Sequence, residues 1–223
     1  MPIVRKVTFI AFFFCLSTSS YLFAQTNELG AFVGNSLYAG TFTKDINDNF
    51  TSAHGAYGLY YRYHIGSKWT IKASAYAGEI SGDGRPAKFK GALADGYYFT
   101  NSIYEFGLNI EYYPLAENPF NGRGFDKQIQ PYFALGMGKT YNLLILKDKT
   151  GVQKNNTDAS PYFTSYMIGM GARYWFDPKV SMSAEAGFRT ILSDSLDGLR
   201  TSRGRDWYSM IGLSLSYFFE DNL

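Results

Sequence analysis

The 223-residue chain contains a single cysteine, Cys15, which lies in a short apolar run near the N-terminus. Beyond that run the chain can form no disulfide and no cysteine-based metal site, and this suits export through an oxidising compartment. No later segment offers the roughly 20 consecutive apolar residues that a membrane-spanning helix needs. The sequence therefore excludes a disulfide-stapled domain and a helical membrane protein.

An excess of charge of either sign is also absent. The chain has 21 Lys+Arg and 19 Asp+Glu, and two of the basic residues, Arg5 and Lys6, lie at the N-terminus. Without these two residues, 19 basic side chains face 19 acidic ones. A neutral chain lacks the basic excess that is typical of nucleic-acid binding, so we expect no nucleic-acid partner.

The N-terminus has the pattern of a secretory signal. Arg5 and Lys6 precede the apolar run Val7–Cys15, and small and polar residues then lead to a cleavage point after Ala24. This pattern is typical of a signal peptide, because the apolar run is too short to cross a bilayer. We predict a signal peptide over residues 1–24 and one domain over residues 25–223.

Alternation with a period of two is the clearest pattern in the remaining chain. In the segment 180–189, one face carries Val180, Met182, Ala184, Ala186 and Phe188, and the other carries Ser181, Ser183, Glu185, Gly187 and Arg189. A period of two indicates a β-strand, since successive side chains point to opposite faces. Similar segments recur, aromatic residues make up 18% of the chain, and many of them gather at the segment ends. This combination favours apolar side chains facing lipid and charged side chains enclosed within a barrel.

Eight such segments can be counted, at residues 28–39, 53–63, 69–80, 102–113, 131–141, 162–176, 180–189 and 207–219. The links after the second and sixth segments are short, whereas most of the others are long and polar. In outer-membrane barrels the short turns are periplasmic and the long loops are extracellular. We therefore predict an all-β fold: a transmembrane, antiparallel, up-and-down barrel of about eight strands, OmpA/OmpX-like, in the bacterial outer membrane.

Several charged residues fall on the predicted inner faces. An eight-stranded barrel has an interior only wide enough for its own side chains, so these charges must be paired. We interpret them as a polar plug; a proton or ion path is the alternative. The predicted lumenal network comprises Arg62, Lys72, Glu105, Glu111, Arg173, Glu185 and Arg189.

The sequence offers little support for catalysis. Of the two histidines, His64 lies at a short turn and His54 is expected to point inward near the outer rim. An outer-membrane lipase or acyltransferase would pair such a histidine with a serine and a carboxylate. Ser52 is close to His54, but no motif links them. We predict no enzyme, no catalytic residue, no cofactor and no metal site.

The outer links suggest lipid partners. The last one contains Arg200, Arg203 and Arg205, a basic cluster for which the phosphates of lipopolysaccharide are the expected target. The acidic stretches 45–48 and 193–197 lack the spacing of a calcium loop. We therefore expect contacts with outer-membrane lipid and lipopolysaccharide.

Several motifs together resemble the PorG-like outer-membrane barrels of Bacteroidota. The most distinctive is a Glu-x-Gly-x-Arg strand, Glu185 to Arg189, that runs into the acidic loop Asp194-Ser-Leu-Asp197; the family pattern usually has an aromatic residue before that leucine. The other matching segments are 27–40, 60–64 with Trp69, 103–112 and 131–138. The resemblance implies an accessory subunit of the type IX secretion and gliding machinery that associates with periplasmic components.

The link 115–130 is long for a periplasmic turn, which makes it the candidate partner loop in this interpretation. Its charged residues are Glu117, Arg123, Asp126 and Lys127. The alternative function is a small structural or adhesive barrel that acts through its outer loops. The two interpretations place the binding surface at opposite ends of the barrel.

Overall fold

The computed structural model describes residues 26–44, 52–115, 128–154, 161–191, 196–199 and 206–220. Eight strands form one closed antiparallel barrel: β1 (Thr26–Ala39), β2 (His54–Ile65), β3 (Trp69–Asp83), β4 (Tyr98–Tyr112), β5 (Ile129–Lys147), β6 (Tyr162–Asp177), β7 (Val180–Ile191) and β8 (Trp207–Glu220). One short 3-10 helix, η1 (Ala87–Phe89), lies in the link between β3 and β4. Among the described residues, no helix has the length and apolarity that crossing a membrane requires. The predicted signal peptide lies outside the described residues.

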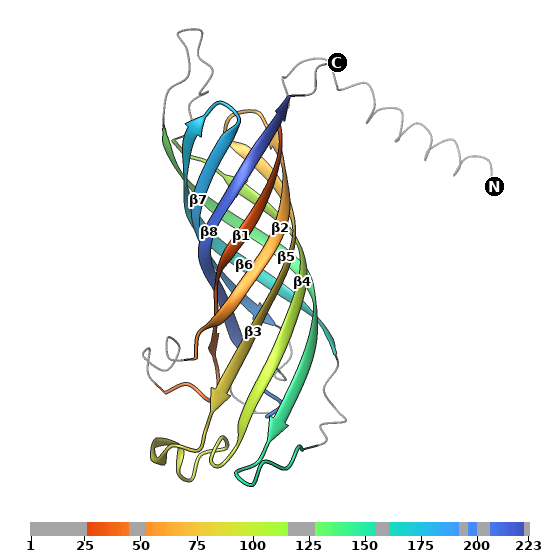
Figure 1. Cartoon of the computed structure of the whole chain (residues 1–223), viewed down its shortest axis with the longest axis vertical. Coiled ribbons are helices and arrows are strands. Elements are labelled where there is room, and N and C mark those ends of the chain that lie inside the picture. Colours follow the sequence, from red (N-terminus) through yellow and green to blue (C-terminus); the bar gives the residue numbers. More distant parts are fainter. Residues whose placement is uncertain are drawn as a thin grey trace, which may run out of the picture.

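Each strand pairs with the next along the chain, and β8 pairs with β1 to close the barrel (Figure 1). The closing pair runs in register from Thr26 opposite Glu220 to Ala39 opposite Trp207. The short links 66–68 and 178–179 lie at the same end as the start of β1 and the end of β8, which we call the turn end. The opposite end, with the four long links, is the loop end. The predicted up-and-down barrel is confirmed.

In four strands the outer face is apolar over the same length before a polar side chain interrupts it. Ten residues separate the last hydrophobic side chain at the turn end from an outward polar one in four strands: Trp69 to Glu79, Tyr112 to Ser102, Ile129 to Lys139, and Phe219 to Ser209. At about 3.3 Å per residue and a tilt of about 40°, ten residues span about 25 Å, the height of the apolar band of outer-membrane barrels.

Aromatic side chains mark both edges of this band. At the turn end, the rings of Trp69 and Tyr112 lie 4.6 Å apart. Towards the loop end, Tyr141 contacts Tyr104 on one side and Tyr162 on the other, with ring centroids 6.3 and 5.0 Å apart. Aromatic rings with a polar group favour the boundary between lipid and water, so these two girdles place the membrane on the barrel.

Three strands are longer than the sequence predicts. β3, β4 and β5 continue past the band and pair as far as Asp83, Tyr98 and Lys147 (Figure 1). The glycines between residues 78 and 84 look like a loop in the sequence, but Gly82 lies within β3. A Cβ atom there would come within 2.5 Å of the Phe99 ring, so the residue is glycine because an aromatic side chain covers it.

Large rings inside the barrel likewise lie over glycines of the neighbouring strand. A Cβ atom on Gly30 would lie 2.3 Å from the ring of Tyr60, and one on Gly58 would lie 2.3 Å from the ring of Tyr76. On the inner faces, large aromatic side chains therefore lie opposite glycines, which lets them fit within a narrow bore. These contacts between rings and glycines help to specify the register of β1, β2 and β3, in addition to the backbone hydrogen bonds.

Candidate functional site

All seven charged residues of the predicted lumenal network lie on inward faces of the strands. Six of the side chains are buried, and the side chain of Glu185 is 11% exposed. The structure divides them into two groups. A larger group lies towards the turn end and a smaller one lies nearer the middle of the barrel. The larger group is Arg62, Lys72, Glu111, Arg173 and Glu185, and the smaller is Glu105 and Arg189.

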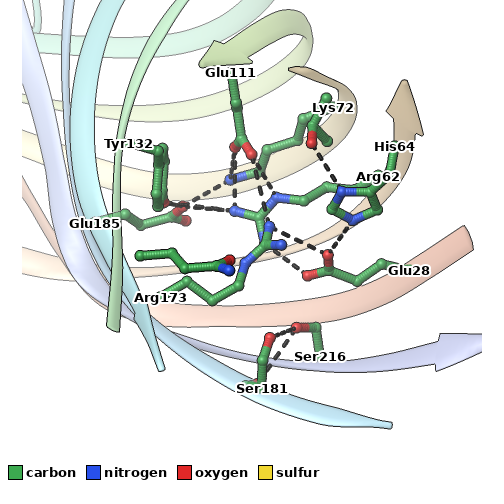
Figure 2. Close-up of polar contacts among 12 residues, drawn as sticks. Glu28, Arg62, His64, Lys72, Glu111, Tyr132, Arg173, Ser181, Glu185 and Ser216 are labelled. Atoms are coloured by element: carbon green, nitrogen blue, oxygen red, sulfur yellow. Dashed lines mark hydrogen bonds and ion pairs between the residues drawn. The ribbon is translucent and has the colours of Figure 1, made fainter. Parts of the chain in front are cut away.

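Arg62 on β2 is at the centre of the larger group (Figure 2). Its guanidinium donates hydrogen bonds to Glu28 at 2.7 Å and to Glu111 at 3.1 Å. It also lies 3.5 Å from the Glu185 carboxylate. The three acidic residues come from β1, β4 and β7, so one planar cation connects distant parts of the wall.

Glu28 is a member of this group that the predicted set lacks. Its carboxylate is fully buried and lies 3.2 Å from the Arg173 guanidinium on β6. The alternation in 28–39 places Glu28 on the same face as Gly30 and Phe32, so the sequence pattern already indicates that Glu28 points inward. With Glu28 included, the two groups together contain four basic and four acidic side chains.

His64 also belongs to the group, although its position near a turn suggested an interfacial residue. Its Nε2 lies 2.9 Å from Glu28, and its Nδ1 lies 2.9 Å from the hydroxyl of Thr70. The imidazole stacks on Phe218, with ring centroids 5.5 Å apart. His64 therefore positions Glu28 from the turn end, where the bore is covered by aromatic rings.

Lys72 and Glu185 form the second contact pair of the larger group. The Lys72 ammonium donates to Glu185 at 2.7 Å, and the hydroxyl of Tyr132 donates to the same carboxylate at 2.8 Å. Tyr113 in turn donates to Glu111 at 2.7 Å. Glu111 and Glu185 thus each accept hydrogen bonds from a basic side chain and from a tyrosine hydroxyl. A buried carboxylate needs such partners to offset its loss of hydration.

The smaller group is built around Glu105 on β4. Arg189 donates through Nε at 2.9 Å, Ser165 donates at 3.1 Å, and the hydroxyl of Tyr208 donates a further hydrogen bond. Thr140 lies 3.2 Å from the same tyrosine hydroxyl. Glu105 and Arg189 form a separate pair: hydroxyls donate further hydrogen bonds to Glu105, and Arg189 also donates to the backbone carbonyl of Gly187 at 2.9 Å.

The bore between the two groups is nearly closed. A cavity of about 30 Å³ is lined by Lys72, Tyr76, Glu111, Tyr132 and Glu185, among others. That volume holds about one or two water molecules. Because these charges are buried and paired and the cavity beside them is small, the geometry of the described residues fits the predicted plug.

Towards the loop end, the interior changes character. The side chains there form an apolar cluster, and the links between strands contribute part of it. Phe42 follows β1, Phe89 belongs to η1, and Leu196 and Leu199 precede β8; each of the four is at most 6% exposed. The strand residues that they cover include Ile80, Phe99, Ile103, Leu146 and Ile191. The sequence pattern does not predict this cluster, because its link residues lie in segments that are polar overall.

Two buried acidic residues are set into the apolar cluster. The Tyr38 hydroxyl donates to Asp197 at 2.6 Å and lies 3.3 Å from Asp206. Asp206 also accepts from the backbone N–H of Leu196 at 3.0 Å, and Asp197 from that of Leu199 at 2.8 Å. These contacts fasten the 196–199 segment into the mouth of the barrel.

The motif that carries the family resemblance can now be assigned to packing. Glu185 and Arg189 are members of the two charged groups, and Leu196 and Asp197 belong to the closure at the loop end. The motif therefore supplies interior contacts at three levels of the bore. The predicted partner loop is different: Glu117, Arg123, Asp126 and Lys127 lie outside the described residues, as does the basic cluster 200–205.

A family model described as "Domain of unknown function (DUF6089)" matches residues 6–223. The chain belongs to this family. No curated protein matches the chain. The family description names no activity, so the function has to be argued from the barrel itself.

Solved structures of similar shape are outer-membrane barrels. The chain is similar to neisserial surface protein A, with 11% identity, a TM-score of 0.51, and coverage of 86% of this chain and 97% of that one. It is also similar to the attachment invasion locus protein Ail of Yersinia pestis, solved with the heparin analogue sucrose octasulfate, at 14% identity, a TM-score of 0.49 and coverage of 88% and 100%. The chain is also similar to OprG from Pseudomonas aeruginosa, with 17% identity, a TM-score of 0.45, and coverage of 88% of this chain and 96% of that one. At these identities the likeness concerns the fold.

The fold and the outer wall together establish the location. A closed barrel with an apolar band about 25 Å high, aromatic girdles and a polar interior is built for a lipid bilayer. Only closed barrels and helices can satisfy every backbone hydrogen bond in lipid. The chain is an outer-membrane β-barrel, and its outer wall contacts the lipid of that membrane.

Proposed function

We propose that the chain is an accessory outer-membrane subunit of a type IX secretion and gliding machinery, and that it docks periplasmic components at its turn end. This role needs no catalysis. The observation that carries the proposal is the filled bore: with both halves of the interior packed, the barrel acts through its surfaces rather than by conduction. The resemblance to PorG-like barrels supports the choice of machinery.

The turn end is the proposed docking surface. In outer-membrane barrels the short turns face the periplasm, and the links 66–68 and 178–179 are short. The third link at this end joins β4 to β5 and is far longer. A polar loop on a rigid scaffold is the usual place for a binding site, so this link is the proposed contact.

Loop replacement tests the proposal. Exchanging residues 117–127 for a short Gly/Ser turn should leave a folded, heat-modifiable barrel that no longer co-purifies with periplasmic secretion components, and secretion should fall with it. The matched control exchanges Asp148–Val152, a turn at the loop end, for Gly/Ser. Secretion and co-purification that persist in the first variant would refute the docking role.

The alternative, a structural or adhesive barrel, is favoured by the charge of the loop end. Among the described residues of the links there and the adjoining strand ends, the basic side chains are Lys44, Arg85, Lys88, Lys90, Lys147, Lys149 and Lys154. Fewer exposed acidic residues accompany them, because Asp197 and Asp206 are buried. Such a surface suits anionic partners, including the phosphates of lipopolysaccharide. Under this alternative, the Asp148–Val152 exchange would reduce surface binding and the 117–127 exchange would not.

A further inference from the structure

Ser81, His54 and Glu79, at the rim of the loop end, are arranged like the catalytic triad of a hydrolase. The Nε2 atom of His54 lies 2.7 Å from the hydroxyl of Ser81, and its Nδ1 atom lies 3.2 Å from the carboxylate of Glu79. A serine nucleophile, a histidine base and an orienting carboxylate have this arrangement in unrelated hydrolases. The triad is recognised by geometry, and here the order serine, histidine, carboxylate is complete.

From the sequence, His54 is expected to point inward near the outer rim, and Ser52 is the nearest serine to it. The register places His54 opposite the buried Ser36, on the inward face of β2 as expected, but its ring extends past the last β2–β3 pair and contacts residues of β3. The side chain of His54, at the first residue of β2, is 34% exposed and contacts Glu79 and Ser81 of β3. These two residues point outward, because Ile80 and Gly82 between and beside them are buried. Since they lie 25 and 27 residues from His54, no local motif could join them.

Two side chains of β1 contact the backbone carbonyls of His54 and Glu79, one from the inner face and one from the outer face. The hydroxyl of Ser36 on β1 has one proton, which the carbonyls of His54, at 3.3 Å, and Glu79 share. The Asn35 amide donates to the same His54 carbonyl at 3.4 Å. A catalytic set must be positioned before substrate arrives, and a rigid sheet with such clamps provides that.

The level of the three residues on the wall indicates the substrate. Glu79 is the first polar residue above the apolar band of β3, one step on the outer face beyond Ala77, which pairs with Tyr57 of β2. One step beyond Ser81, Asp83 forms an ion pair with Arg85 at 2.7 Å, and both are half exposed. The three residues thus face the boundary between acyl chains and headgroups, where the ester bonds of lipids lie. With the turn end in the periplasm, this boundary belongs to the outer leaflet.

We infer that Ser81, His54 and Glu79 form a hydrolase site that cleaves carboxylic esters of outer-leaflet lipids. This activity goes beyond the docking role and does not rest on it. The catalytic residues are Ser81 as nucleophile and His54 as general base, and Glu79 is the positioning residue that holds the imidazole.

The chemistry is balanced with water as the second substrate. The Ser81 oxygen attacks the ester carbonyl while His54 takes its proton. The tetrahedral intermediate then expels the alcohol, which leaves with the proton from His54 and gives an acyl ester on Ser81. Water attacks that ester, His54 accepts the proton of the water, and collapse releases the fatty acid and returns the proton to Ser81.

Thr100 is placed to stabilise the negative oxygen of the intermediate. It is the register partner of Ser81 on β4, and both side chains point outward. Side chains opposite each other in an antiparallel pair have Cβ atoms about 4.5–5.5 Å apart. The Thr100 hydroxyl can therefore reach the carbonyl oxygen of an ester bound to Ser81 and donate a hydrogen bond to it.

The first experiment is active-site labelling of the full-length protein, folded in detergent micelles, with a fluorophosphonate probe. We expect a covalent adduct, located by mass spectrometry at Ser81. The adduct should be absent in Ser81→Ala, and labelling should be at least 100-fold slower in His54→Gln. Ser209→Ala is the matched control, because Ser209 is a partly exposed rim serine on β8, and it should be labelled at the native rate. Heat-modifiability on gels verifies the fold of each variant.

The second experiment identifies the ester. The protein is placed in vesicles of phosphatidylethanolamine, or in the same vesicles with lipopolysaccharide, and released fatty acid is measured. Release from the first indicates a phospholipid substrate, and release from the second alone indicates an acyl ester of lipid A. Failure of the native protein to label, or a native labelling rate in Ser81→Ala, would show a polar surface cluster and overturn the inference. Labelling without fatty-acid release from either vesicle would overturn lipid as the substrate.

Discussion

The two halves of the bore fill the same narrow space by opposite means. Near the turn end, charged side chains from five strands converge on Arg62. Near the loop end, apolar side chains from the strands and links pack together, with Asp197 and Asp206 held at their edge by Tyr38. The first half is built from strands alone, whereas the second needs its links to be complete.

This difference follows from where each half lies. The charged half is surrounded by lipid-facing wall, so the interior must supply every partner, and directional contacts between distant strands then specify the register. The apolar half opens to solvent, and covering it with hydrophobic side chains removes water from the mouth. The comparison predicts that the charged half is the more sensitive to single substitutions, because an unpaired buried charge costs more than a cavity.

The largest effect is expected for Arg62→Met. This change leaves Glu28, Glu111 and Glu185 without their shared cation, and removing one partner of a buried ion pair costs about 3–5 kcal/mol. The free energy of unfolding in urea, followed by the shift between folded and unfolded bands on gels, measures the loss. The matched control is Arg85→Met, because Arg85 forms a half-exposed ion pair, for which little change is expected. Equal losses in the two variants would contradict the central role of Arg62.

The charged half was also the half that the sequence predicted better. Alternation places a side chain inside or outside, so a period of two was enough to find seven of the eight charged residues on the inner faces. It could not pair them, because Arg62 and Glu185 are 123 positions apart and meet only when the barrel closes. Glu28 was omitted although the same alternation includes it.

The apolar half was not predicted, and the reason is physical. Phe42, Phe89 and Leu196 are single apolar residues within polar links, and no periodicity identifies them. The end of β3 was missed for a related reason, since Gly82 there makes room for the rings of Phe99 and Phe42. Contacts between segments that are distant in sequence decide these positions, as they decide the neighbours of His54.

A smaller effect is expected for Leu196→Ala. The side chain is fully buried in the apolar half, and truncation of a buried leucine costs about 2–5 kcal/mol. We expect a value near the lower limit, about 2 kcal/mol, because the side chains around Leu196 can relax into part of the space. Urea unfolding gives the value, with Leu93→Ala as control, since Leu93 is 50% exposed. A loss larger than that of Arg62→Met would reverse the order of the two halves.

Tyr38→Phe sharpens the comparison at the polar edge of the apolar half. It removes one hydroxyl and leaves the ring in contact with Phe99. The Asp197 carboxylate then loses a donor at 2.6 Å, and a buried acceptor without its partner costs about 1–3 kcal/mol. Tyr57→Phe is the control, because Tyr57 is 66% exposed on the outer wall. If the urea concentration at the midpoint of unfolding is the same for both variants and the native protein, the Tyr38 hydroxyl does not fasten the 196–199 segment.

The smallest expected effect is on conductance, and it tests whether the two halves are independent seals. Native protein in a planar bilayer should give no steady ion current, because the described bore is filled at both levels. Leu196→Ala should also give none: it weakens the closure at the mouth, but an ion that enters still meets the paired charges around Arg62. Conductance is recorded for the native protein, for Leu196→Ala and for Leu93→Ala under the same voltage and salt. Steady channels in the native protein would refute a filled interior. Channels in Leu196→Ala alone would show that the apolar half is the only seal and that the charged half admits ions.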